Sequence, residues 1–147
     1  MAEQFNADWA RGIINGGTET AKSFIEDPAK IDELIAQLMQ KMEELPSTVA
    51  ESFANVPLMA QMVKGYVTQE YTDVSPKVVV SLVAAFLYLV KQRDLIPDYI
   101  PVVGFLDDLA IITFALAINK PELEAYAQWK AEKDGEEPFR IVDSETL

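Results

Sequence analysis

The stretch that decides the fold is 78–90, VVVSLVAAFLYLV, in which only Ser81 and Tyr88 carry a polar side-chain atom. Ser75-Pro76 precedes it and supplies the serine N-cap and the N1 proline that are typical of a helix start. A helix that is apolar on nearly every side lies either at the centre of a bundle or in a membrane. This run rises about 20 Å, whereas a bilayer core requires about 20 apolar residues, or 30 Å. We therefore predict a buried central helix over 76–92.

A second apolar run covers 109–118. We predict a helix over 107–119, because Asp107 and Asp108 place negative charge at its N-terminus, where it is favoured. The stretch 99–118 has the length of a membrane span, but two carboxylates in mid-membrane are costly. A conventional transmembrane helix is therefore not expected, and a hairpin that dips partly into a bilayer stays open as an alternative. The two apolar helices are predicted to pack together as a hairpin.

The clearest amphipathic helix is predicted over 28–45. Asp27 supplies its N-cap, Pro28 its first residue and Pro46 its end. Lys41 lies among the polar residues between the apolar ones. A stripe that contains methionines is usually an ordinary core-facing stripe, and an adaptable binding groove is the alternative. The apolar residues, spaced by three and four, are Ile31, Leu34, Ile35, Leu38, Met39, Met42 and Leu45.

Weaker signals predict further helices. Thr48 and Glu51 have the spacing of a capping box, which would start a short helix before Pro57. Pro121 is predicted to start a last helix, and Gly135 follows its end. The predicted segments are a first short helix from 6–8 to the Gly16-Gly17 break, and helices over 18–26, 57–70 and 121–133.

These patterns predict an all-α fold, and no strand pattern competes with them. We expect a compact helical bundle in which a central apolar helical hairpin is wrapped by amphipathic helices. Within one structural domain, we expect amphipathic helices packing on the core over 1–56, a helical hairpin domain over 57–133 and an acidic flexible tail over 134–147.

The composition joins an apolar interior to an acidic surface. Half of the 147 residues are apolar, yet 24 acidic residues face 12 basic ones, for a formal charge of −12. A disordered acidic chain is excluded because it would lack the apolar residues to fold. Nucleic acid and anionic lipid are disfavoured as partners because the chain has no surplus of basic residues to neutralise phosphate.

The chain has no cysteine or histidine, which removes disulfides, cysteine nucleophiles, thiolate or imidazole zinc sites and histidine-dependent triads. No targeting segment is recognisable at the N-terminus, so we expect a cytoplasmic protein, with membrane association as an alternative.

The two apolar helices are joined by 94–108, DLIPDYIPVVGFLDD, which contains the echo Asp-Leu-Ile-Pro and Asp-Tyr-Ile-Pro. Pro97 and Pro101 push the residues before them into extended conformations. The aspartates can accept hydrogen bonds from nearby backbone N–H groups in Asx-type turns. Gly104 permits a positive φ or a close approach to another segment. We therefore expect an ordered connector whose apolar residues, Tyr99 among them, belong to the core.

This connector resembles that of the YkvA-like family, a bacterial domain of unknown function. The resemblance covers roughly 57–132. The chain departs from the family where Lys91-Gln92-Arg93 precedes Asp94, because the family usually has a Ser-Pro-type approach there. The resemblance implies an apolar helical hairpin that is often suspected of membrane association, and it implies no established activity. The other matching segments are Met62-Val63-Lys64-x-Tyr66, Glu70-Tyr71, Leu87-Tyr88 and 123–130.

The apolar region holds one dense cluster of carboxylates, namely Asp94, Asp98, Asp107 and Asp108. One hypothesis is a site for Mg²⁺ or Ca²⁺, because these cations prefer oxygen ligands. The interpretation that we favour needs no cofactor: the aspartates cap turns and a helix, with Arg93 or Lys64 as ion-pair partners. A paired-carboxylate acid–base mechanism would also require a cleft lined by aromatic side chains, and Tyr99 lies in a run that looks like core.

We therefore expect a non-enzymatic helical interaction or scaffold protein. Its partner would be another protein, a membrane-bound complex or a second copy of the chain that binds through the methionine-bearing helix. One alternative is peripheral or hairpin-type association with a membrane surface. A second alternative is a divalent-cation-dependent hydrolase that uses the aspartates.

Overall fold

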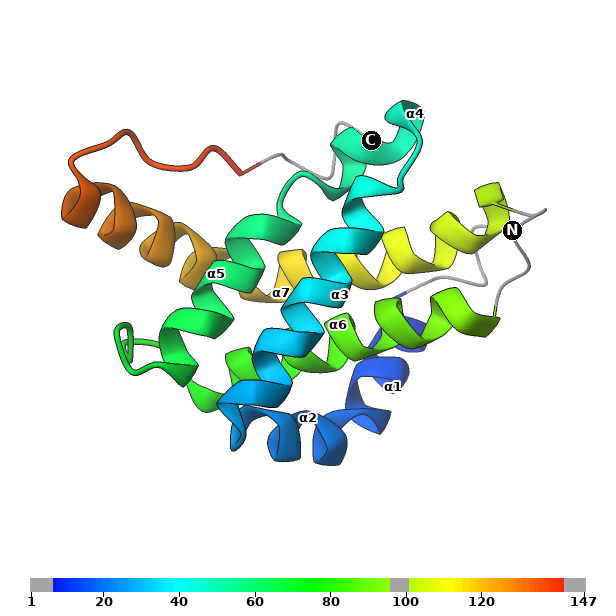
Figure 1. Ribbon diagram of the computed structural model, residues 1–147, viewed down its shortest axis with the longest axis horizontal. Coiled ribbons are helices and arrows are strands. Elements are labelled where there is room, and N and C mark those ends of the chain that lie inside the picture. The colour runs from blue at the N-terminus through cyan, green and yellow to red at the C-terminus, as the bar shows by residue number, and fades with distance from the viewer. Residues whose placement is uncertain (1–6, 96–100, 142–147) are drawn as a thin grey trace.

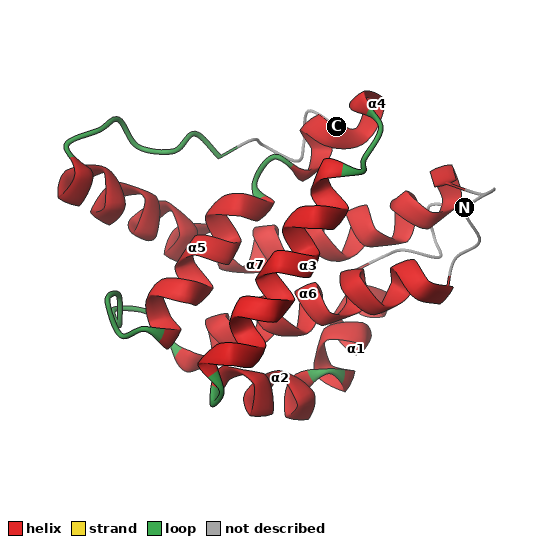
Figure 2. Cartoon of the chain, viewed as in Figure 1, coloured by secondary structure: helices red, strands yellow, loops and turns green. Residues whose placement is uncertain are grey.

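Helix α6 (Pro76–Leu95) runs through the middle of the molecule, and α1, α2, α3, α5 and α7 all pack against it (Figure 1). The computed structural model describes residues 7–95 and 101–141. Its elements are α1 (Ala7–Gly16), α2 (Thr18–Ile25), α3 (Pro28–Glu43), α4 (Ser47–Ala50), the 3-10 turn η2 (Glu51–Phe53), α5 (Val56–Val67), α6 and α7 (Pro101–Asp134). The described residues contain no strand, as Figure 2 shows, so the predicted all-α bundle is confirmed.

The prediction of a buried central helix is confirmed in α6. Its side chains are enclosed on several sides, because neighbours pack around much of its circumference. No described helix is both long enough and apolar enough to cross a membrane. The residues of α6 with no exposed surface are Val79, Leu82, Val83, Ala85, Phe86 and Leu89.

Helix α7 corrects three predictions. It begins at Pro101, so Asp107 and Asp108 lie in its second turn and do not cap its N-terminus. Gly104 is a helical residue and does not take the positive φ that the sequence allowed. Pro121 lies inside the same helix, where a separate helix was predicted to begin. Proline removes the hydrogen bond to the carbonyl group four residues earlier. Here that group belongs to Ala117, whose exposure lets water satisfy it.

The amphipathic helices agree with the sequence in position and differ at their ends. Asp27 caps α3 as predicted, because its carboxylate accepts a hydrogen bond from the Ala29 backbone N–H at 3.1 Å. Thr48 was predicted to be an N-cap but lies inside α4, since that helix begins at Ser47 with Pro46 as its N-cap. Helix α5 ends at Val67, short of the predicted end at residue 70, and Gln69 then takes a φ of 66°.

Candidate functional site

A buried ion pair joins α3 to α7. The Lys41 ammonium donates a hydrogen bond to Asp108 Oδ2 at 2.6 Å and another to the Leu89 carbonyl oxygen of α6. The Lys41 and Asp108 side chains are only 5% and 1% exposed. One ammonium group therefore links three helices inside the apolar core.

Tyr88 and Asp107 extend this polar cluster. The Tyr88 hydroxyl donates to Asp107 Oδ2 at 2.8 Å, and the Trp9 ring packs edge-on against the Tyr88 ring. Oδ1 of Asp107 and Oδ1 of Asp108 are buried and accept no hydrogen bond from the described residues. Asp108 is thus paired with the Lys41 ammonium and Asp107 with the Tyr88 hydroxyl, and each carboxylate keeps one buried oxygen that receives no donor from the described residues.

Burial in this cluster changes the pKa values of Asp108 and Tyr88. Burial raises the pKa of Asp108 to about 6, although the hydrogen bond from Lys41 and its positive charge act to lower it. Burial also raises the pKa of Tyr88 well above its ordinary value, and the hydrogen bond to Asp107 and the charge of Asp107 add to that effect. Because the cluster is enclosed by apolar side chains, it suits fixing helices together better than acting on a substrate.

The structure describes only part of the predicted cation site. Asp94 and Arg93 lie at the end of α6, and their side chains fall outside the described residues. Pro97, Asp98 and Tyr99 lie outside them altogether. Among the residues that are described, no three acidic side chains gather as they would around a metal ion.

Lys64 has a different partner within the described residues. Its ammonium pairs with Asp32 on α3 in an exposed ion pair, and its predicted pairing with Asp94 or Asp98 lies outside the described residues. Lys41 is the lysine that pairs with Asp108. Pro101 occupies the first position of α7, where its missing N–H costs nothing.

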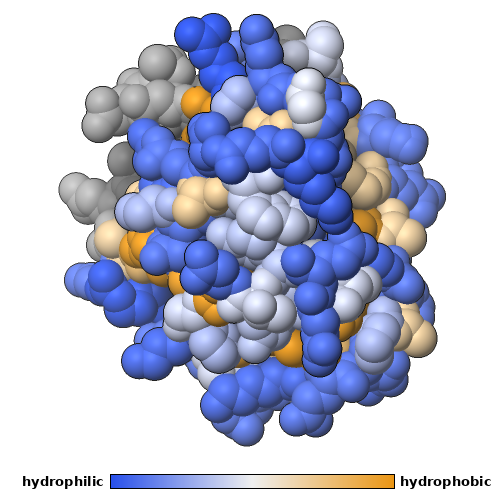
Figure 3. Space-filling view, turned by 90° about the vertical axis from the view of Figure 1, so that its left-hand side faces the viewer, coloured by the Kyte–Doolittle hydropathy of each residue, from blue (hydrophilic) through white to orange (hydrophobic). Residues whose placement is uncertain are grey.

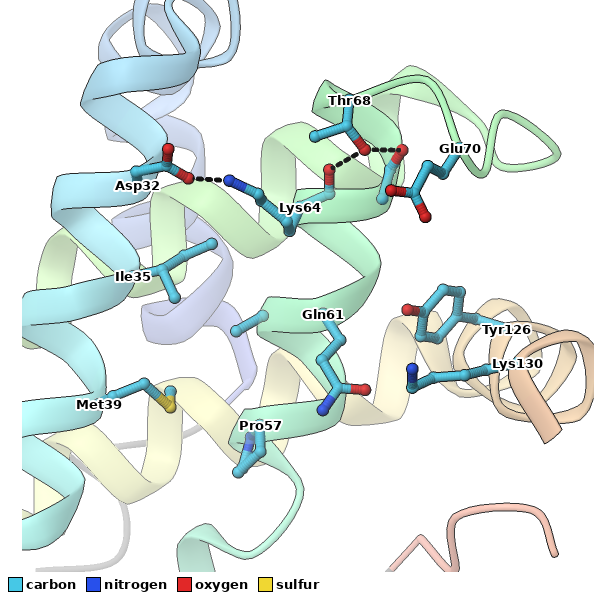
Figure 4. Close-up of a pocket in the computed structure, with 12 residues that line it drawn as sticks. Asp32, Ile35, Met39, Pro57, Gln61, Lys64, Thr68, Glu70, Tyr126 and Lys130 are labelled. Carbon is cyan, nitrogen blue, oxygen red and sulfur yellow. Dashed lines mark hydrogen bonds and ion pairs between the residues drawn. The ribbon is translucent and has the colours of Figure 1, made fainter. Parts of the chain in front are cut away.

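A surface groove of about 480 Å³ lies over α5. We call it the α5 groove. Figure 4 shows that α5 provides its floor, while α3 and the second half of α7 stand on either side. Ile35 and Met39, two residues of the methionine-bearing stripe, give the groove an apolar wall on α3. The side chains that define it are Asp32, Ile35 and Met39 on α3, Pro57, Gln61 and Lys64 on α5, and Tyr126 and Lys130 on α7.

An aromatic cluster sets the α7 wall of this groove. The Tyr71 ring lies 4.9 Å from the Tyr126 ring and 4.9 Å from the Trp129 ring, centroid to centroid. Gly65 on α5 allows this approach, because a Cβ atom there would lie 3.3 Å from the Tyr71 Cβ and 3.7 Å from the Tyr126 ring. The second half of α7 is thereby held against α5.

Comparison with known proteins gives the family. A family model described as a protein of unknown function, DUF1232, matches residues 78–114. An uncharacterized membrane protein YkvA of Bacillus subtilis (strain 168) is 36% identical over 70 residues, which is 48% of this chain and 66% of that protein. These matches support a YkvA-like family assignment for this chain. The match spans just under two thirds of the length of that relative. No solved structure matches the chain.

Only part of the buried cluster lies within the residues matched by the family model. Tyr88, Asp107 and Asp108 lie within the matched residues 78–114 of this YkvA-like protein, whereas Lys41 lies outside them. The α5 groove also lies outside that region. In this chain, the buried Asp108 carboxylate of the YkvA-like hairpin is therefore paired with a lysine from α3, a helix that the family model does not cover.

Sequence reasoning missed Lys41, although a signal was present. Lys41 follows Leu38 by three residues, so it lies on the same face of α3 as Ile31 and Leu34, and it is buried with them. Tyr88 gave a similar signal, because it stands with Ser81 on one line of α6. Tyr88 and Ser81 both have hydrogen-bond partners on α7. Tyr88 binds Asp107, and the Asn119 amide donates to the Ser81 hydroxyl at 2.9 Å.

Proposed function

We propose that this YkvA-like protein acts without catalysis, by binding another protein, and that it takes a helical segment of that partner in the α5 groove. The observation that carries the proposal is the groove itself, open along one helix and flanked by two others. Helix-in-groove binding requires such a surface with apolar anchoring positions inside it.

The dimensions of the groove fit a short helix. Its floor follows Pro57, Gln61, Lys64 and Thr68, which recur at three- and four-residue spacing on the outer face of α5. Helix α5 has 12 residues and is therefore about 18 Å long. A partner helix of about three turns would match this length.

The lining supports a protein segment as the ligand. Ile35, Met39 and Ala60 offer apolar contacts, and methionine adapts its shape to different partners. Gln61 stands exposed in the middle of the floor, where its amide can both donate and accept hydrogen bonds. Apolar anchors surrounded by polar groups are the usual composition of a protein interface.

Site-specific photo-crosslinking tests the proposal. In cells of the organism that makes the protein, a photoreactive amino acid would replace Gln61 in the groove. The control places the same amino acid at Gln37, an exposed α3 residue outside the groove. We expect a discrete adduct of higher mass from position 61 and none from position 37. Identical adducts from both positions, or none from position 61, would contradict a partner in the groove.

The Bacillus subtilis relative is called a membrane protein, and this favours a second candidate function, peripheral membrane association. In support, Ile118 on α7 is 46% exposed and Phe114, one turn earlier, is partly exposed. The test is flotation with vesicles of zwitterionic lipid, because an acidic protein is repelled by anionic lipid. We would expect the protein to float with the vesicles and Ile118→Glu to abolish flotation. An intact protein that stays unbound would contradict this candidate.

A further inference from the structure

We infer that the segment received by the α5 groove is a basic amphipathic helix, with lysine or arginine beside its apolar side chains. This inference rests on the proposed function and names the chemistry of the partner. It is carried by the charges around the groove and around a second hollow that continues from it.

The second hollow extends the groove toward the end of α7. It measures about 230 Å³, and Gln61 and Lys130 line both cavities. Phe139 adds an apolar side chain there that is 39% exposed. A helix in the groove would therefore reach a further apolar contact at this end.

The charges of this joined surface are unequal. Its lining has two ammonium groups, those of Lys64 and Lys130. The five carboxylates of the lining belong to Asp32, Glu70, Asp134, Glu136 and Glu137.

Both ammonium groups are already bound within the protein. Lys64 pairs with Asp32, and Lys130 pairs with Asp134 at 3.1 Å. The Glu70 carboxylate receives Lys133 from outside the lining, also at 3.1 Å.

The remaining acids are available to a partner. Glu136 and Glu137 are exposed, and no ion pair to either occurs within the described part of the chain. Figure 3 views the molecule from the side on which α7 ends, and hydrophilic side chains cover most of that face, with apolar ones in small separate spots. A cation brought there meets unpaired negative charge.

This pattern selects among partners. Complementary charge speeds encounter and excludes partners of the same sign. A second copy of the chain also carries a charge of −12, so its acidic helices would be repelled. A basic segment gains attraction at the rim, and its apolar side chains gain contact with Met39 and Phe139.

The test uses three synthetic helical peptides of one length. All have leucine at three- and four-residue spacing, and their polar positions are all lysine, all glutamine or all glutamate. Binding to the full chain is measured by fluorescence anisotropy at low and at physiological salt. We expect the lysine peptide to bind about tenfold more tightly than the glutamine peptide, with an advantage that shrinks as salt rises. We expect the glutamate peptide to bind least.

Variants locate the binding. Gln61→Trp fills the groove and should weaken binding of the lysine and glutamine peptides alike. Glu136→Gln with Glu137→Gln should remove most of the lysine peptide's advantage. The matched control is Glu26→Gln with Glu33→Gln, which removes the same charge from exposed residues outside both cavities and should keep most of that advantage.

The outcomes separate the two proposals. If the lysine and glutamine peptides bind equally and Gln61→Trp weakens both, the inference about charge is wrong and the groove still binds helices. If the two double variants reduce lysine-peptide binding equally, attraction is general to the acidic protein and the inference is overturned. If no peptide binds at either salt concentration, this inference is overturned as well, while the crosslinking result at position 61 still decides the proposed function.

Discussion

Lys41 on α3 and Asp108 on α7 are 67 residues apart in the sequence, and their charged atoms meet at 2.6 Å inside the core. Placing charges in an apolar interior is costly unless they are paired. The pair therefore adds a specific polar contact to the apolar packing that holds α3 against the hairpin.

Removing one partner of this pair should destabilise the protein strongly. We expect Lys41→Met or Asp108→Asn to lower the free energy of unfolding by about 3–5 kcal/mol, because either change disrupts a buried charged contact. The double variant Lys41→Met with Asp108→Leu should return to within about 2 kcal/mol of the wild type. Urea denaturation measures all three. The exposed pair Lys64–Asp32 is the control, and breaking it with Lys64→Met should cost less than about 1 kcal/mol. Equal losses at the two pairs would contradict the prediction.

The ionisation of Asp108 predicts how stability depends on pH. Its pKa of about 6 in the folded protein lies above the ordinary value of 3.8, so the folded state binds this proton more readily than the unfolded state. This group's contribution to the free energy of unfolding therefore rises as pH falls from above 6 toward 4. Carbon-13 NMR of the Asp108 carboxyl group should show a titration midpoint near 6, and a midpoint below 4 would refute the assignment. Asp108→Asn should lack this component in unfolding measurements at pH 7 and pH 5.

The hydroxyl of Tyr88 should contribute to the stability of the fold. Tyr88→Phe keeps the packing against Trp9 but leaves Asp107 Oδ2 without its donor, which should cost about 1–3 kcal/mol. Tyr66→Phe is a suitable comparison, because no hydrogen bond of the Tyr66 hydroxyl occurs in the described structure, and it should change stability little. Thermal unfolding of both variants provides the measurement. Equal stability of the two variants would show that the Asp107 contact is not stabilising.

Calcium and magnesium should leave the carboxylate cluster unchanged. Lys41 already supplies a positive charge to Asp108, and the Tyr88 hydroxyl occupies Oδ2 of Asp107, so neither carboxylate is free to bind as a whole. We expect no saturable heat when Mg²⁺ or Ca²⁺ is titrated into the protein in a calorimeter, and no change in melting temperature. Saturable binding that Asp107→Asn removes would revive the cation hypothesis.

The sequence predicts the elements of this fold better than it predicts their polar contacts. The α6 helix could be identified because an apolar run with a serine-proline start has few other structures available to it. Residue type groups Lys41 with the polar residues of its helix, although its spacing from Leu38 places it on the buried face. Asp107 and Asp108 were expected to cap a helix because they precede an apolar run, but Pro101 starts that helix earlier.

The α5 groove could not be predicted from the sequence. Its lining comes from three helices, represented by Met39, Gln61 and Lys130, and no local pattern relates such distant positions. Its shape also depends on how closely α7 approaches α5, which Gly65 and the aromatic rings decide. Each helix could be predicted separately, but the space between them depends on their packing.

The central position of α6 has a consequence for synthesis. Helices α1, α2, α3 and α5 precede it in the chain and all pack against it, while α7 follows. When α6 leaves the ribosome, most of the helices that cover it have therefore already been made. At about 5–20 residues per second, α7 completes the cover within seconds. The order of helices along the chain thus limits how long its most apolar segment is open to aggregation during translation.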